Sequence, residues 1–263
     1  MLPRGWTIFG TTRSPDKARA MTERGVTPIL WPGADLPLER ATHLLTSVSP
    51  GQDDPVLAAH GDQISRAPHL RWVGYLSTVG VYGDQQGGWV DEDTPPNAAS
   101  ARAQARIKAE AAWQDICDRA GVRLHIFRLA GIYGPGRGPI AKLREGRAQR
   151  VVKPGQYFSR IHQADIGQAL DLAIRSDIGS RIYNLCDDMP APPQDVLACA
   201  ARLAGLPVPP EVPFEDADLS PMARSFYADS KRVRNDRIKR ELGLDLHYPD
   251  YESGLRNILA EEG

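Results

Sequence analysis

The stretch LRWVGYLSTV, residues 70–79, decides the fold. Its apolar residues run continuously instead of alternating, which is typical of a strand buried on both faces. Similar short runs occur at residues 26–30 (VTPIL), 43–48 (HLLTSV) and 123–134 (RLHIFRLAGIYG), with helical segments between most of them. Strands and helices that alternate at this spacing predict an α/β fold with a doubly wound parallel sheet and right-handed crossovers.

The N-terminal segment continues this alternation. WTIFGTT, residues 6–12, predicts a strand that is followed at once by a helix. Ser14 is a favourable N-cap, Pro15 suits the first helical position, and Gly25 suits the stop.

The amino-acid composition of the sequence changes after residue 134. Glycine- and proline-rich stretches predict a smaller lobe made of residues 136–159 and 187–263. The sheet domain then consists of residues 1–135 together with about 160–186, because ADIGQALDLAI and RIYNL return to the sheet. The basic stretch 230–243 predicts a helix with a solvated face.

Composition excludes several classes of function. The net charge of −1 over 263 residues provides no field that would draw the protein to nucleic acid or to an anionic membrane. Three widely spaced cysteines fit a reducing compartment, and no apolar run approaches the roughly 20 residues of a membrane span. We therefore expect a cytoplasmic protein that contacts neither nucleic acid nor membrane. A small-molecule partner and a homodimer are further expectations, which composition does not decide.

The residues at the predicted strand ends carry a family resemblance. GTTRS, TSVSP, LSTVGVYGD and RLAGIYGPGR occur in this order, joined by WVDEDTPPN, FSRIHQADIGQAL and YNLCDD. This series resembles the extended short-chain dehydrogenase/reductases, the NAD(P)-dependent epimerase/dehydratase family, and most closely its atypical branch. The resemblance runs from about Gly5 to Tyr251. It implies a Rossmann-like dinucleotide-binding domain, a nicotinamide cofactor, and a C-terminal lobe that binds the substrate.

The active-site helix departs from the family pattern. The family carries Tyr-x-x-x-Lys, with a glutamate four residues after the lysine, and setting Glu110 at that glutamate places Arg102 and Arg106 at the catalytic positions. Arginine, with a pKa above about 12, cannot replace a tyrosine that gives and takes a proton. At i and i+4 the two arginines share a helix face and would suit a carboxylate or phosphate. The alternative is a solvent-facing, ion-paired helix.

Other family positions supply candidate substrate contacts. Thr78 matches the Ser/Thr that hydrogen-bonds a substrate oxygen, although it could instead cap its own backbone. Tyr82 is a less specific candidate, since this tyrosine is usually structural in the family. Arg160 and His162 match the stretch that closes over the substrate, and His162 could equally be a packed structural histidine.

The resemblance also implies the cofactor residues. They are Gly10, Thr11, Thr12, Arg13, Ser14, Ser47, Val48, Ser77, Ala130 and Gly131. Arg13 lies where this fold puts a basic group for a 2′-phosphate, so we expect NADP in preference to NAD. The alternative for Arg13 is a surface arginine at the start of a helix.

The glycine-rich turn that holds the cofactor pyrophosphate in the family does not occur here. MLPRG, residues 1–5, instead resembles the last turn of the helix that would follow it. We expect the DNA upstream of Met1 to encode the missing strand and turn. Otherwise the sheet should show a gap beside WTIFG or a substitute strand, and the 263-residue chain should bind either cofactor weakly or not at all.

Two functions remain in competition. The first is an NADP-dependent oxidoreductase or epimerase that acts on a small, anionic substrate. The second is a non-catalytic dinucleotide-binding sensor or scaffold that has lost the catalytic pair, which the two arginines favour. No metal-ligand spacing and no nucleophile elbow occur, so we expect neither a metal site nor a hydrolase.

Overall fold

The computed structural model describes residues 4–262. Its main sheet has four parallel strands in the order β10-β6-β4-β3, as predicted for a doubly wound α/β fold. The strands are β3 (His43–Thr46), β4 (Trp72–Thr78), β6 (Arg123–Leu129) and β10 (Arg181–Leu185). In this register Tyr75 of β4 lies opposite Thr46 of β3 and Ile126 of β6.

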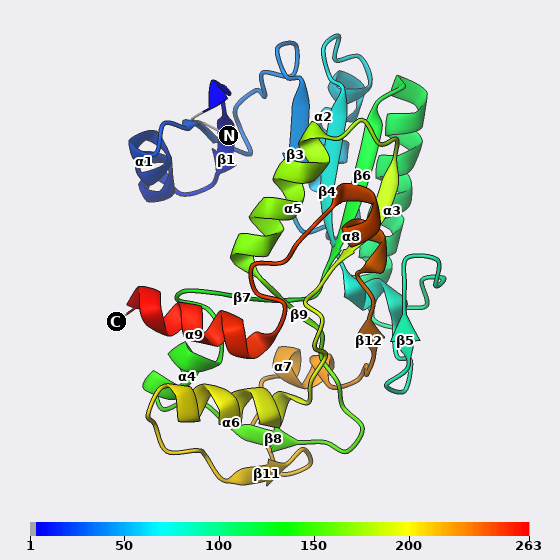
Figure 1. Cartoon of the computed structure of the whole chain (residues 1–263). Helices are drawn as coiled ribbons and strands as arrows, with labels where there is room; N and C mark the ends of the chain where they lie inside the picture. The colour runs from blue at the N-terminus through cyan, green and yellow to red at the C-terminus, as the bar shows by residue number, and fades with distance from the viewer. Residues whose placement is uncertain (1–3, 263) are drawn as a thin grey trace.

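Helices cover both faces of this sheet (Figure 1). On one face, α2 (Pro55–Ser65) and α3 (Ala101–Ala120) pack against Val73, Tyr75 and Leu124. On the other face, α5 (Gln163–Arg175) and α8 (Asp236–Leu242) pack against the remaining side chains of the strands. The continuous apolar pattern of residues 70–79 therefore has the predicted cause, because successive side chains enter two separate cores.

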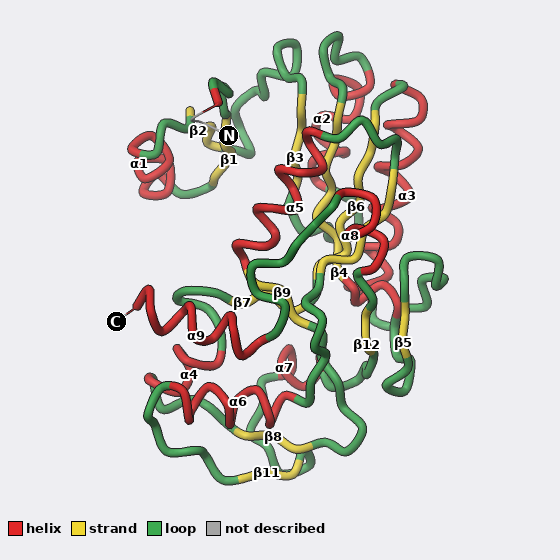
Figure 2. The backbone as a smooth tube through the Cα atoms, viewed as in Figure 1, coloured by secondary structure: helices red, strands yellow, loops and turns green. Residues whose placement is uncertain are grey.

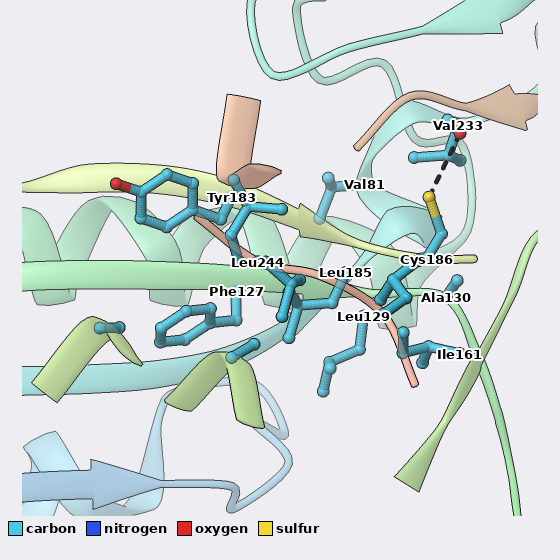
Figure 3. Close-up of a cluster of buried hydrophobic side chains, with 14 of the residues drawn as sticks. Val81, Phe127, Leu129, Ala130, Ile161, Tyr183, Leu185, Cys186, Val233 and Leu244 are labelled. Atoms are coloured by element: carbon cyan, nitrogen blue, oxygen red, sulfur yellow. Dashed lines mark hydrogen bonds between the residues drawn. The ribbon is translucent and has the colours of Figure 1, made fainter. Parts of the chain in front are cut away.

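The core beneath α5 and α8 extends to the carboxyl ends of β6 and β10 (Figure 3). There the Cys186 thiol donates to the carbonyl of Val233 at 3.2 Å. Ile161, which follows the predicted boundary at about residue 160, is fully buried in the same cluster. Carboxyl strand ends are where parallel sheets of this type bind ligands, so this core fixes the edge on which the site is built.

The N-terminal elements form a separate unit. Here β1 (Phe9–Thr12) and β2 (Thr27–Leu30) make a parallel two-stranded sheet connected by α1 (Pro15–Glu23). Within residues 4–262, β1 pairs only with β2 and β3 only with β4, so the expected gap beside WTIFG is confirmed. Figure 1 shows this unit to one side of the main sheet.

Side-chain contacts attach the N-terminal unit to the rest of the molecule. Trp6 lies edge-on to His43 of β3, with ring centroids 4.7 Å apart. Trp31 donates to His60 of α2 at 2.8 Å. Arg4 pairs with Asp171 of α5 at 2.6 Å. These contacts hold the unit although, in the described part of the chain, no backbone ladder joins it to the main sheet.

The remaining elements lie below the carboxyl ends of the strands, and Figure 2 shows how short most of them are. They include the helices α4 (Pro139–Arg144), α6 (Pro193–Leu203), α7 (Pro221–Phe226) and α9 (Tyr251–Glu262), the single turn η2 (Val79–Tyr82), and three strand pairs. The pairs are β7 (Gly131–Tyr133) with β9 (Arg160–His162), β8 (Arg150–Val152) with β11 (Glu211–Pro213), and β5 (Trp89–Val90) with β12 (Arg232–Val233).

Two element predictions are wrong in detail. The run 123–134 is two strands, because the backbone leaves the main sheet at Ala130 and β7 pairs with β9. The stretch 230–243 is helical only from Asp236, because residues 232–233 pair with β5 instead. No helix within the described part of the chain is long and apolar enough to cross a membrane.

Candidate functional site

A buried polar network links the strand ends of the main sheet. Glu110 of α3 and Arg128 of β6 form an ion pair at 2.8 Å, with side chains 7% and 3% exposed. Ser77 donates its hydroxyl proton to the same carboxylate. Arg128 also donates to the Tyr82 hydroxyl at 3.0 Å, which in turn donates to Asn184 at 2.8 Å. The network holds η2 in place through Tyr82. Its two charges are tolerated in the interior because Glu110 and Arg128 neutralise each other.

This network explains Tyr82 and Ser77. Tyr82 is fully buried, and burial raises the pKa of its phenol to about 12 despite the neighbouring Arg128. Its hydroxyl is occupied on both sides, so it fits the structural role that the family resemblance gave it. Ser77, an expected cofactor residue, donates its hydroxyl proton to Glu110.

Arg106 lies against the carboxyl end of β4. One of its terminal nitrogens donates to the Tyr75 hydroxyl and to the Leu76 carbonyl, both at 3.0 Å. The other donates to Ser49, just after β3, at 3.3 Å. Burial raises the pKa of Tyr75 to about 12, with Arg106 acting against that shift. Arg106 is thus a half-buried cation fixed between the ends of β3 and β4.

Arg102 has a different environment. It occupies the first turn of α3, is exposed, and its guanidinium carbon lies 5.1 Å over the ring of Phe226 in α7. Among the described residues, its nitrogens have no hydrogen-bond or ion-pair partner within the usual distances. The two arginines therefore share a helix face without sharing a protein partner.

Thr78 ends β4 and caps the turn that follows. Its hydroxyl oxygen accepts from the Gly80 amide at 3.1 Å, which is the local capping geometry considered as the alternative to a substrate contact. The residue is only partly buried. A hydroxyl that accepts one bond can still donate its proton, so Thr78 remains chemically able to hold a substrate oxygen.

The expected cofactor residues fall into two separate groups. Gly10, Thr11, Thr12, Arg13 and Ser14 belong to or follow β1, whereas Ser47, Val48, Ser77, Ala130 and Gly131 lie at the ends of β3, β4 and β6. The unpaired edges of β1 and β3 separate the groups. Arg13 is exposed at the carboxyl end of β1.

Local packing accounts for several members of these groups. At Gly10, a Cβ atom would lie 3.0 Å from a Val26 methyl carbon and 3.2 Å from the Met21 sulfur, so a larger residue would require these side chains to shift. Ser14 caps α1 by accepting from the Lys17 amide at 3.4 Å. The Ala130 amide donates to the Leu185 carbonyl at 3.0 Å.

Arg160 and His162 lie on β9. Arg160 donates to the carbonyls of Phe158 and Ala191 at 2.8 and 3.2 Å. Nearby Asp187 is 1% exposed, one of its oxygens has no partner among the described residues, and burial raises its pKa to about 8. Arg160 opposes that shift.

His162 is packed between aromatic rings. Its ring lies 4.2 Å from Tyr248 and 5.2 Å from Tyr133, measured between centroids. The residue is 2% exposed, its Nδ1 atom accepts from the Ala164 amide, and burial lowers its pKa. This environment matches the packed structural histidine that the sequence left open.

Two surface pockets lie outside the predicted site. One of about 280 Å³ is lined by Asp84, Gln86, Lys153, Pro154, Gly155, Gln156, Ala228 and Ser230. The other, of about 410 Å³, is lined by Arg150, Asp195, Ala198, Cys199, Arg202, Leu203, Tyr251 and Glu252. Neither is lined by a predicted site residue. Within residues 4–262, no group of three or more His, Cys, Asp or Glu side chains could hold a metal ion.

Sequence reasoning missed three partners in the site. Ser49, Tyr75 and Phe226 hold the two arginines, and none follows from helix or strand periodicity. Arg128 did carry a signal, because a lone arginine in the apolar run HIFRLA requires a buried partner.

Comparison with known proteins gives a family match for part of the chain. The family described as "NAD dependent epimerase/dehydratase family" matches residues 63–186. Protein YeeZ of Escherichia coli (strain K12) is 33% identical over 181 residues, which are 67% of this chain and 58% of that protein. The chain therefore matches less than two thirds of the length of this curated relative.

Solved structures extend the comparison over the whole chain. A functionally unknown conserved protein from Silicibacter pomeroyi is 56% identical, with 98% of this chain and 92% of that chain covered and a TM-score of 0.92. Human epimerase family protein SDR39U1 with NADPH is 16% identical, with 98% and 92% covered and a TM-score of 0.73.

MoeE5, in complex with UDP-glucuronic acid and NAD, is 19% identical over 100% of this chain and 93% of its own, with a TM-score of 0.76. At these low identities the last two share the fold. Together with the strand-end motifs and the parallel sheet, the match over residues 63–186 makes this chain similar to the NAD-dependent epimerase/dehydratase family.

Proposed function

We propose that the protein is an NADP-dependent oxidoreductase or epimerase that acts on a small anionic substrate without a tyrosine proton relay. The observation that carries the proposal is the pair Arg102 and Arg106 at the catalytic positions of α3. Arg106 is fixed to β4 by two 3.0 Å hydrogen bonds, and Arg102 keeps its donors available. Two cations at the carboxyl edge favour a carboxylate or phosphate group on the substrate.

The cofactor fits this chain in part. Arg13, exposed at the end of β1, suits the 2′-phosphate of NADP, and SDR39U1 was solved with NADPH. The strand ends around Ser47, Ser77 and Gly131 suit the nicotinamide side. For the pyrophosphate, no glycine-rich turn joins β1 to α1, and the glycine cluster at residues 134–138 leads into the six-residue α4, which begins at Pro139. Cofactor binding by this chain is therefore expected to be weak. When bound, NADP supplies hydride transfer, while Thr78 would orient the substrate oxygen.

Arg13 provides the test of cofactor choice. We expect wild type to bind NADP more tightly than NAD, and Arg13→Ala to lose about 10- to 150-fold in NADP affinity while keeping that for NAD. Arg19→Ala on α1, where Arg19 pairs with exposed Asp16, is the matched control. Equal affinities of wild type for the two cofactors would refute the choice of NADP.

The arginine pair provides the test of chemistry. Arg102→Tyr with Arg106→Lys should raise reductase activity with a neutral carbonyl compound and weaken the binding of carboxylated ligands. Cofactor oxidation followed by absorbance and ligand binding followed by calorimetry measure the two effects. If Arg102→Ala and Arg106→Ala leave anion binding unchanged, the anion site is wrong.

A second candidate is a non-catalytic dinucleotide-binding sensor or scaffold. The burial of Tyr75 and Tyr82 favours it, because both phenols have pKa values raised to about 12 and both hydroxyls are already bonded. Substrate-dependent hydride transfer separates the two candidates. Location in the cytoplasm, a homodimeric state, and the division into residues 1–135 with 160–186 and residues 136–159 with 187–263 remain predictions.

A further inference from the structure

The contact between Arg102 and Phe226 joins two distant parts of the chain at the proposed anion site. Arg102 lies in the first turn of α3, which packs on the main sheet, whereas Phe226 ends α7. The guanidinium carbon is 5.1 Å from the ring centroid, and the Phe226 side chain remains 50% exposed. The ring is therefore positioned to support the cation while solvent still reaches the site.

The segment that carries Phe226 is firmly anchored on its other side. The next residue, Tyr227, is 9% exposed and packs between Phe158 and Phe214, at centroid distances of 5.4 and 5.1 Å. Lys153 donates to the Tyr227 carbonyl, and Arg224 donates to the Ala217 carbonyl at 2.8 Å. The backbone on both sides of Phe226 is thus anchored by these contacts.

Lys153, Arg224 and Arg102 differ in the hydrogen-bond partners of their N–H groups. Lys153 and Arg224 both lie over the Phe214 ring, at 5.3 and 4.7 Å, and both bond backbone carbonyls. Arg102 lies over an aromatic ring in the same way but keeps its N–H groups without a partner in the described residues. A guanidinium group that lies over a ring uses its face, so its in-plane N–H groups remain able to bind an anion in a bidentate way.

We propose that Phe226 is a positioning residue that holds the Arg102 guanidinium group ready for bidentate binding of a carboxylate or phosphate. This proposal rests on the anion site proposed above. It adds that α7 determines the orientation of the donors, and hence the preference for planar or tetrahedral oxyanions over simple halide ions. Because a fixed guanidinium loses less rotational freedom on binding, the aromatic ring contributes to affinity without touching the anion.

Calorimetric titration with malonate and with inorganic phosphate at low ionic strength tests the proposal. Phe226→Leu should weaken both anions about 2- to 5-fold, the fold-change that corresponds to an exposed cation–π contact. Phe226→Tyr should restore wild-type affinity, and Met222→Ala, at a 64% exposed residue one helical turn earlier, should leave it unchanged. In an Arg102→Ala background, Phe226→Leu should have no further effect.

The outcomes separate this inference from the function on which it rests. If Arg102→Ala weakens anion binding but Phe226→Leu does not, the positioning role is wrong and the anion site stands. If Phe226→Leu weakens binding and Phe226→Tyr fails to restore it, the ring acts through packing and the proposal is overturned. If Arg102→Ala changes nothing, Arg102 does not bind the anion and the positioning role of Phe226 is wrong; if Arg106→Ala also changes nothing, the anion site itself is wrong. The Arg102 Nε–H resonance should sharpen with phosphate in wild type and not in Phe226→Leu, which a general loss of packing would not produce.

Discussion

Strands β1 and β4 begin from similar sequences and reach very different environments. Both are short apolar runs that end in threonine. The first four residues of β4 are buried, among them Trp72, Val73 and Tyr75, whereas β1 has no buried residue. The difference lies in their neighbours, because β4 pairs on both sides and β1 on one. Burial is thus set by the partners that a strand finds, and apolar composition alone does not guarantee it.

The two regions also differ in their polar groups. The main sheet and its covering helix α3 share the buried pair Glu110–Arg128, whereas the N-terminal unit has the exposed pair Asp16–Arg19. Apolar side chains of the unit remain in solvent, with Phe9 37% and Leu30 49% exposed. We therefore expect the main sheet to carry most of the stability of the molecule.

The largest effect should come from breaking the buried ion pair. Arg128→Met leaves the Glu110 carboxylate buried without its partner, which should lower the free energy of unfolding by about 3–5 kcal/mol. Urea unfolding followed by tryptophan fluorescence measures it. Arg119→Met is the control, since Arg119 and Asp115 are paired at 2.6 Å on the exposed face of the same helix, and it should cost less than about 1 kcal/mol. Equal losses in the two variants would contradict the contrast.

Truncation of apolar side chains tests the contrast directly. Leu124→Ala in β6 removes a fully buried side chain and should cost about 2–5 kcal/mol. Ile29→Ala in β2 removes a half-buried one and should cost less than about 1 kcal/mol. The same urea titrations compare the two. A larger loss for Ile29→Ala would mean that the N-terminal unit is integral to the cooperative core.

The buried carboxyl group of Asp187, just beyond β10, makes the stability of the main-sheet region dependent on pH. Burial raises the pKa of Asp187 to about 8 in the folded protein, well above the value of about 4 of an unfolded chain. The folded state therefore binds this proton more tightly, and the contribution of Asp187 to stability falls as pH rises from about 4 to about 8.

Asp187→Asn removes that titration. Relative to wild type, the variant should gain on the order of 2 kcal/mol between pH 5 and pH 8, because solvation within the folded protein reduces the full effect of the shift. Urea midpoints at the two pH values measure the gain. Asp188→Asn, at the adjacent and more exposed residue that pairs with Lys239, is the control. A gain that is independent of pH would assign the effect to hydrogen bonding alone.

The sequence was sufficient for the regular part of the fold. Continuous apolar runs predicted β3, β4 and β6, and the strand-end motifs indicated the family resemblance. The lack of the family's first strand and glycine-rich turn predicted either a gap beside β1 or a substitute strand, and the gap is what the described residues show. It could not predict that the run 123–134 breaks at Ala130, because the break depends on pairing with residues 160–162, which are distant in sequence. For the site, the i and i+4 spacing correctly put Arg102 and Arg106 on one face. Their separate partners, Phe226 and Tyr75, arise from tertiary contacts that no local pattern encodes.

The smallest expected effect comes from two helix caps with the same local sequence chemistry. Both α1 and α2 begin with a capping residue followed by proline, Ser14–Pro15 and Asp54–Pro55. Ser14 accepts one bond, at 3.4 Å, whereas Asp54 accepts from two backbone amides at 2.9 and 3.0 Å and from Trp113 at 3.1 Å.

We therefore expect Asp54→Ala to cost about 1–2 kcal/mol and Ser14→Ala about 0.5 kcal/mol or less. The Ser14 change should appear mainly as faster hydrogen exchange of the α1 amides. Within residues 4–262 the N-terminal unit is joined to the main sheet by side-chain contacts without strand pairing, so it can open without global unfolding. Exchange followed by mass spectrometry on peptides that cover residues 15–23 and 55–65 measures both. Slower exchange in α1 than in α2 in the wild-type protein would show that the N-terminal unit is more firmly held than its unpaired strand edge implies.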